Sequence, residues 1–135
     1  MKKALDRLCN PITYTEVSNG NAHQIETSHS VLQKTIGDVV LARKDIGTSY
    51  HLSVVVDDAE QEIDLVTRGQ DMADQTPIHR VLQLLLEYPE PYYHHHKLIR
   101  DETGKRLAKR DDARTIRKYR AEGYSPQEVK ALLRL

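Results

Sequence analysis

The clearest pattern of apolar positions lies in the stretch TPIHRVLQLLLEY, residues 76–88. Its apolar residues recur at the three- and four-residue spacing of one helix face: Ile78, Val81, Leu82 and Leu85. Thr76 is a good N-cap residue, and Pro77 suits the first helical position. Pro89 and Pro91 cannot continue a helix. The pattern therefore predicts a helix that begins at Pro77 and ends before Pro89.

Three shorter apolar runs predict strands. They are DVVLAR from residue 38, IDLVTRG ending at Gly69, and YYHHHKLI from residue 92. The stretch YHLSVVVDDAEQE, residues 50–62, allows two interpretations. The β-branched residues 54–56 favour a strand, whereas the spacing of Tyr50, Val54 and the acids at 57 and 58 would suit one face of a helix.

Both ends of the chain differ from this middle part. Residues 1–36 are polar and weakly periodic, and SNGNAHQ is typical of a turn or loop, so we expect little regular structure there. The sequence RDETG predicts a turn, and DARTIRKYRAEG predicts a helix with Gly123 as its C-cap. In SPQEVKALLRL, Ser125 and Glu128 form a capping box around Pro126 and open a last helix with an apolar face of Leu132, Leu133 and Leu135. Strands that alternate with helices predict an α/β fold.

Composition narrows the class of protein. The chain has 135 residues, which is enough for one domain with a modest core. The formal net charge is zero, so only local clusters favour a nucleic acid or an anionic surface. Cys9 is the single cysteine, which excludes an intramolecular disulfide and a cysteine-rich zinc site. No apolar run reaches membrane length and no signal peptide is visible, so we expect a cytoplasmic protein without membrane partners.

The run His94, His95 and His96 raises the question of a metal site. Neighbouring residues of a strand point to opposite faces, so His94 and His96 can share a face and His95 cannot join them. A metal site would need ligands from elsewhere in the chain. We therefore favour a half-buried strand with polar edges over a metal site.

A basic cluster follows this strand. The segment 97–120 holds ten basic and four acidic residues, and four of the basic residues crowd around one turn: Lys105, Arg106, Lys109 and Arg110. Such a loop suits a polyphosphate whose charge builds in a transition state. A plain solvated surface explains the cluster equally well. GKRLAK is not a Walker A loop, because Ile99 stands where the first glycine is needed.

Two stretches together resemble a known family. GKRLAKR resembles the second signature loop of class I aminoacyl-tRNA synthetases, often written KMSKS. TSYHLSVVVDDAEQEIDLVTRGQDMADQTPIHRVLQLL resembles, in order and spacing, the matching part of glutamyl-tRNA synthetases. Val54, where full glutamyl-tRNA synthetases usually carry Asn, favours the shorter glutamyl-queuosine tRNA(Asp) synthetases. The resemblance covers Gly37 to Leu135.

The resemblance implies an activity and its substrates. The family uses ATP, with Mg²⁺, to activate glutamate as glutamyl-adenylate. Full synthetases then charge tRNA(Glu), and the shorter members attach glutamate to queuosine in tRNA(Asp). By resemblance, Tyr50 helps to hold the amino group of glutamate and Arg68 binds its carboxylate. Lys109 would stabilise the triphosphate as pyrophosphate leaves, with Arg106 in place of the first lysine and Lys105 and Arg110 beside them.

The resemblance also implies a fold. It makes residues 50–59 a helix, and it divides the chain into a poorly defined segment 1–36 and a partial catalytic domain 37–135. The expected fold is α/β: the C-terminal portion of a class I synthetase Rossmann-like catalytic domain, followed by a small helical region that carries the KMSKS-type loop.

Several family features are missing from the sequence. The HIGH motif and the zinc cluster are absent, Ala108 replaces the usual serine of the loop, and Glu60-Gln61-Glu62 replaces a Leu-Gln-Gly turn. Adenylation needs both signatures around one ATP. We therefore expect no zinc site, a chain that is inactive alone, and either a homodimer or a missing N-terminal half as partner. The alternative is a non-catalytic remnant that binds nucleotide, tRNA or another protein.

Overall fold

The computed structural model describes residues 1–100, 104 and 115–132. The chain forms two compact units, Met1–His96 and Lys97–Leu135. Within the described residues, none of the helices has the length and apolar character that crossing a membrane requires.

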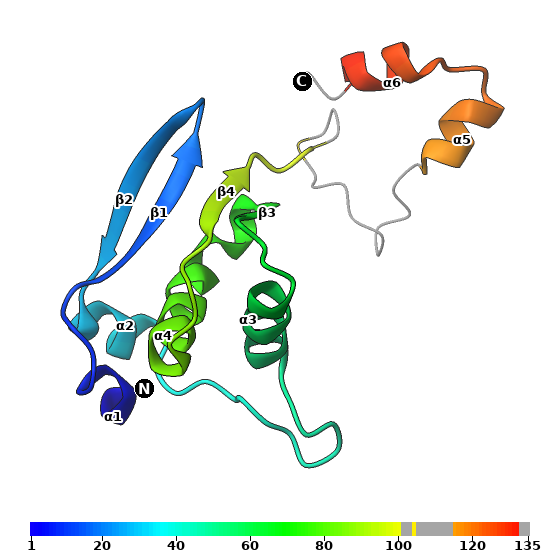
Figure 1. Cartoon of the computed structure of the whole chain (residues 1–135). Helices are drawn as coiled ribbons and strands as arrows, with labels where there is room; N and C mark the ends of the chain where they lie inside the picture. The colour runs from blue at the N-terminus through cyan, green and yellow to red at the C-terminus, as the bar shows by residue number, and fades with distance from the viewer. Residues whose placement is uncertain (101–103, 105–114, 133–135) are drawn as a thin grey trace. The chain divides into compact units, whose positions relative to one another are not determined.

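The first unit is built on a four-stranded mixed sheet (Figure 1). Its strands are β1 (Ile12–Ser18), β2 (Asn21–Thr27), β3 (Leu65–Gly69) and β4 (Tyr92–His96), in the spatial order β2-β1-β4-β3. β1 and β2 form an antiparallel hairpin, whereas β1, β4 and β3 run parallel. Parallel strands with helical connections confirm the predicted α/β fold.

The helices of this unit are α1 (Lys2–Leu5), α2 (His29–Thr35), α3 (Tyr50–Glu60) and α4 (Thr76–Leu86), with a 3-10 helix η1 (Gln70–Gln75) before α4. Residues 50–60 are thus a helix, as the family resemblance implied. The apolar stripe of α4 is buried as predicted, at Ile78, Val81 and Leu82. The helix begins one residue earlier than expected, because the Thr76 hydroxyl hydrogen-bonds His95 instead of capping the helix.

Residues 1–36 differ from the expectation of little regular structure. They supply α1, β1, β2 and α2, and they help to build a core from Leu5, Ile12, Leu32 and Val81. The hairpin turns at Asn19 and Gly20, whose φ angles of 51° and 76° are left-handed. The predicted turn or loop in SNGNAHQ is thus a hairpin turn, for which an Asn-Gly pair is the strongest short signal, whereas the two strands around it were not predicted.

The predicted strand at residues 38–43 is wrong. The segment between α2 and α3 contains no strand, and most of its side chains are exposed, including Val40 at 63%. Of residues 38–43, Val39 is the one that packs against a core cluster. A short apolar run forms a strand only when a neighbouring strand accepts its hydrogen bonds.

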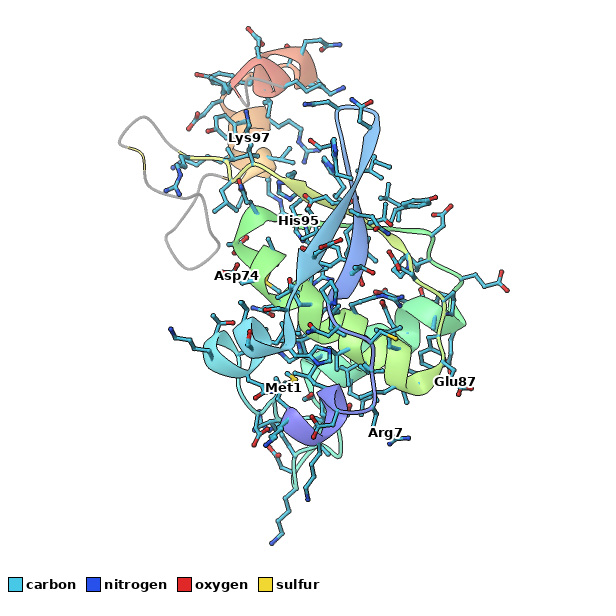
Figure 2. The ribbon with its side chains drawn as sticks, turned by 90° about the vertical axis from the view of Figure 1, so that its left-hand side faces the viewer. Met1, Arg7, Asp74, Glu87, His95 and Lys97 are labelled. Carbon is cyan, nitrogen blue, oxygen red and sulfur yellow. The ribbon has the colours of Figure 1, made fainter. Side chains whose placement is uncertain are left out.

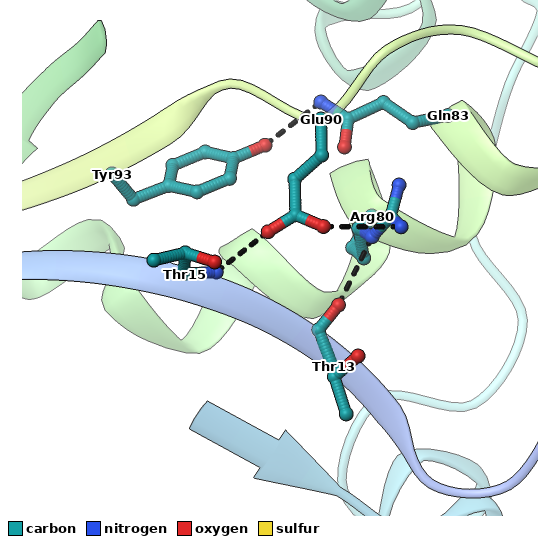
Figure 3. Close-up of polar contacts among 6 residues, drawn as sticks. All are labelled: Thr13, Thr15, Arg80, Gln83, Glu90 and Tyr93. Atoms are coloured by element: carbon teal, nitrogen blue, oxygen red, sulfur yellow. Dashed lines mark hydrogen bonds and ion pairs between the residues drawn. The ribbon is translucent and has the colours of Figure 1, made fainter. Parts of the chain in front are cut away.

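A polar network joins the hairpin to the rest of the sheet (Figure 3). β1 and β4 share a single paired position, Glu16 with Tyr93. The Glu90 carboxylate accepts from the Thr15 amide at 2.7 Å and pairs with Arg80 at 3.1 Å. Arg80 in turn donates to the Thr13 carbonyl at 3.0 Å. On the edge of β1 that faces β4, hydrogen bonds from side chains thus take the place of most of the backbone pairing.

The end of α3 carries a strained residue. Glu62 has a φ of 55°, in the left-handed region that favours glycine. Its amide donates to the Ala59 carbonyl and the Ile63 amide to the Asp58 carbonyl, which is a Schellman cap. This is the position at which the resemblance implies a family glycine.

We therefore expect Glu62→Gly to raise the free energy of unfolding by about 1 kcal/mol, because glycine removes the left-handed penalty. Urea denaturation followed by circular dichroism measures the change. Glu60→Gly, at the last residue of α3, is the matched control and does not raise the same free energy, because Glu60 is helical and has no left-handed penalty to lose. A loss of stability in Glu62→Gly would contradict the strained cap.

The second unit contains α5 (Ile116–Ala121) and α6 (Pro126–Leu132). Gly123 has a φ of 89° and closes α5 with a Schellman cap, as predicted. The capping box is also confirmed: the Ser125 amide donates to Glu128 Oε2 at 2.8 Å, and the Glu128 amide donates to Ser125 Oγ at 3.2 Å. Leu132 is 54% exposed, and Leu133 and Leu135 lie outside the described residues. Of the predicted RDETG turn, residues 101–103 also lie outside them.

Candidate functional site

The candidate site is centred on Arg68, near the carboxyl end of β3. Alternation along the strand places Arg68 on the face of the buried Val66. Its Cζ lies 5.4 Å from the centroid of the Tyr93 ring, which is the geometry of a cation–π contact. Its Nη2 lies 2.8 Å from His79 Nδ1, whereas its Nη1 is buried and has no hydrogen-bond partner among the described residues. A guanidinium whose buried Nη1 has no partner among the described residues has donors available for an anion.

Two histidines, His79 and His51, form a hydrogen-bonded chain with Arg68. His79 lies on α4 and is 1% exposed, and its Nε2 lies 3.0 Å from Nδ1 of His51 on α3. Burial, then Arg68, then His51 lower the pKa of His79 to about 3. Burial and then Arg68 also lower the pKa of His51. Both rings are therefore neutral at neutral pH.

Tyr50 opens α3 and lies at the rim of the same cluster. Its ring centroid is 5.8 Å from that of His79 and 5.4 Å from that of His51. Half of the tyrosine is exposed, at 51%. The structure thus brings Tyr50 and Arg68, which are 18 positions apart in the sequence, to one histidine. Their roles toward glutamate stay predictions.

Asp58 and Tyr93 complete the surroundings of Arg68. Burial raises the pKa of Asp58, and the nearby Arg68 partly offsets this rise. Burial also raises the pKa of Tyr93, whose hydroxyl accepts a hydrogen bond from Gln83 Nε2 at 2.8 Å (Figure 3). The phenol therefore stays neutral beneath the arginine.

Sequence reasoning missed His51, His79 and Asp58. His79 interrupts the apolar stripe of α4 between Ile78 and Val81. A polar residue beside a buried apolar stripe is the signal that could have found it, because buried polar groups require partners.

Comparison with known proteins identifies the family. Residues 7–135 match the family described as tRNA synthetases class I (E and Q), catalytic domain. The chain belongs to this family. It is 56% identical over 118 residues to the glutamyl-Q tRNA(Asp) synthetase of Rhodobacter capsulatus, a match that covers 86% of this chain and 42% of the relative. The glutamyl-Q tRNA(Asp) synthetase of Nocardia farcinica is 43% identical over 109 residues, which are 81% of this chain and 35% of that relative.

A more distant relative and a solved structure agree with this family. Glutamate–tRNA ligase 2 of Coxiella burnetii is 38% identical over 100 residues, with 74% of this chain and 21% of the relative covered. The crystal structure of the glutamate-tRNA synthetase from Elizabethkingia anophelis superimposes with a TM-score of 0.58 and 25% identity, over 82% of this chain and 23% of that one. The chain spans less than half the length of the curated relatives it matches.

Two histidines of the run, His94 and His95, make structural contacts. His94 Nδ1 lies 2.8 Å from the Val17 carbonyl. His95, labelled on β4 in Figure 2, lies 3.0 Å from the Thr76 hydroxyl through Nε2. Its Nδ1 is 3.2 Å from Glu16 Oε1, without the alignment of a hydrogen bond. Among the described residues, no group of three or more His, Cys, Asp or Glu side chains has the arrangement of a metal site.

The basic loop is the other part of the site that the sequence predicts. Its four predicted phosphate-binding residues, Lys105, Arg106, Lys109 and Arg110, lie outside the described residues. Their role toward ATP stays a prediction from the sequence.

Proposed function

We propose that this chain is the part of a glutamyl-queuosine tRNA(Asp) synthetase-like enzyme that binds the glutamate substrate and carries the KMSKS-type loop. The observation that carries this proposal is the Arg68 guanidinium, whose buried Nη1 lacks a partner among the described residues. Its Nη2 contacts His79, and the half-exposed Tyr50 lies against the same histidine. Two relatives that cover more than four fifths of the chain are named glutamyl-Q tRNA(Asp) synthetases, which supports the substrate.

The proposed reaction begins with activation of glutamate. A carboxylate oxygen of glutamate attacks the α-phosphate of ATP, so that glutamyl-adenylate forms and pyrophosphate leaves. Arg68 and Tyr50 hold the amino acid, and Lys109 with the neighbouring Lys105, Arg106 and Arg110 balances the charge of the triphosphate. The glutamyl group is then transferred from the adenylate to the tRNA and AMP leaves, with tRNA(Asp) as the proposed acceptor.

We further propose that the chain corresponds to the C-terminal part of the catalytic domain and does not form the adenylate alone. It spans 42% of the relative from Rhodobacter capsulatus, and its sequence contains no HIGH motif. Correct positioning supplies much of the rate in such reactions, and it requires both signatures around one ATP. The rest of the domain is thus the proposed partner.

Binding of L-glutamate to the purified chain tests the proposal. In a ¹H–¹⁵N NMR titration, L-glutamate shifts the signals of Tyr50, His51, Arg68 and His79, and D-glutamate and L-glutamine do not. Arg68→Gln weakens the affinity about tenfold to a hundredfold, because a hydrogen bond to a charged group contributes about 1.5–3 kcal/mol. Arg68→Lys keeps the positive charge but lacks the planar guanidinium, so its affinity for L-glutamate lies between those of the wild type and Arg68→Gln.

Arg7→Gln is the matched control, since Arg7 is exposed on the first unit and far in sequence from the site (Figure 2). It leaves the affinity unchanged. Equal binding of L-glutamate by wild type and Arg68→Gln would overturn the glutamate role. Glutamate-dependent ATP–pyrophosphate exchange by the chain alone would overturn the proposal that it needs a partner.

A further inference from the structure

The proposed function does not account for the two histidines behind Arg68. His79 is 1% exposed and hydrogen-bonds on both sides, to Arg68 through Nδ1 and to His51 through Nε2. We propose that His79, supported by His51, is a positioning residue that fixes the guanidinium of Arg68 and leaves its Nη1 for the substrate carboxylate. The carboxylate part of this inference rests on the proposed function.

The hydrogen-bond directions follow from the chemistry of arginine. A guanidinium only donates, so Arg68 Nη2 donates and His79 Nδ1 accepts. His79 must then carry its proton on Nε2, from which it donates to His51 Nδ1. His51 in turn holds its proton on Nε2. The hydrogen bonds therefore run from Arg68 to His79 and from His79 to His51. Because each ring accepts through Nδ1, both rings must be neutral.

A neutral acceptor suits this position because it orients the arginine without cancelling its charge. An acidic side chain at position 79 would form an internal ion pair with Arg68 and compete with an anionic ligand. Asp58 is such a competitor, since it lies near enough for Arg68 to lower its pKa against the effect of burial. The hydrogen bond to His79 and the contact with the Tyr93 ring are the contacts that orient the guanidinium.

The two terminal nitrogens of Arg68 favour a positioning role of His79 over a role in core packing alone. Nη1 of Arg68 is buried and lacks a partner in the described part of the chain, although Nη2 of the same group is satisfied. A guanidinium free to turn would not keep one edge empty in a buried place, because an unsatisfied buried donor is costly. The arrangement therefore points to an edge that is held ready for a ligand.

Four variants of the full chain separate positioning from packing. His79→Leu removes both hydrogen bonds. His79→Asn restores the acceptor for Arg68, since the asparagine carbonyl oxygen occupies the place of Nδ1. His51→Leu removes only the hydrogen bond between His51 and His79. It replaces His79→Leu as the test variant if His79→Leu does not fold. His23→Gln, on the exposed strand β2, is the control.

The first readout needs no ligand. In ¹⁵N NMR of the arginine side chains, Arg68 of the wild type shows separate Nη1 and Nη2 signals, because rotation of the group is restricted. The ring spectrum shows His79 unprotonated at Nδ1. In His79→Leu the Arg68 signals average, and in His79→Asn they separate again. Averaged signals in wild type, or separate signals in both His79→Leu and His51→Leu, would overturn the positioning role.

The second readout is the affinity for L-glutamate. His79→Leu weakens binding about tenfold, as expected when the orienting hydrogen bond to a charged group is lost. His79→Asn recovers most of the affinity, and His23→Gln leaves it unchanged. If wild type binds no glutamate but the arginine and ring signals are as expected, the proposed function fails and the positioning of Arg68 stands. If wild type and His79→Leu bind equally, the positioning role fails and the proposed function stands.

Discussion

Leu32→Ala lowers the free energy of unfolding of the first unit by about 2–5 kcal/mol. Leu32 lies on α2, is 1% exposed and packs in one cluster with Leu5, Ile12 and Val81. Removal of its side chain loses the transfer free energy of the buried carbons and leaves a cavity among these residues. Small domains have a total stability of about 5–15 kcal/mol, so one such change removes a large share.

Urea denaturation measures this loss, with circular dichroism and tyrosine fluorescence as two independent signals. Leu86→Ala is the matched control, because Leu86 is 41% exposed at the end of α4. We expect it to cost well under half as much. A loss below about 1 kcal/mol in Leu32→Ala would contradict the packing of α2 in this core. The result thus decides whether residues 1–36 belong to the fold.

We expect the free energy of unfolding to fall as the pH is lowered from 6.5 to 5, a range above the ordinary pKa of carboxyl groups. The pKa of His79 is about 3 in the folded state, and the ordinary value of 6.5 applies to the unfolded chain. Between pH 6.5 and 3, His79 is protonated in the unfolded state and neutral in the folded state. The contribution of His79 to stability is therefore complete above pH 6.5 and is lost as the pH falls from 6.5 toward 3, by about 1.4 kcal/mol per pH unit.

Neighbouring groups modify this slope in known directions. The lowered pKa of His51 adds to the loss, since its folded form also resists protonation. The raised pKa of Asp58 acts in the opposite direction, because the folded state protonates this carboxyl more readily than the unfolded state does. Between pH 6.5 and 5, where Asp58 contributes least, we expect a loss of about 2 kcal/mol from His79.

Urea denaturation at pH 7, 6 and 5 gives the slope directly. In His79→Asn the slope becomes much shallower, because the titrating ring is gone. His23→Gln, a change on the exposed strand β2, keeps the slope of the wild type. An identical slope in wild type and His79→Asn would show that His79 does not remain neutral in the folded protein.

Much of the local structure follows from the sequence alone. The stripe on α4, the strand that ends at Gly69, the C-cap at Gly123 and the capping box of Ser125 and Glu128 are all read from neighbours within one or two turns. The family is also readable, because its spacing of residues extends over most of the chain. The resemblance assigned α3 to a helix where propensity left two interpretations open.

Only the tertiary structure decided the place of the hairpin and the environment of Arg68. β1 and β2 are polar enough to look like a loop. They are strands because they pair with each other, and because β4, Glu90 and Arg80 bind β1 from positions far away in the sequence. Residues 38–43 are apolar enough to look like a strand and have no such neighbour. His79 becomes a buried neutral acceptor only where α3, α4 and β3 meet, because burial and hydrogen bonding depend on residues that are far apart in the chain.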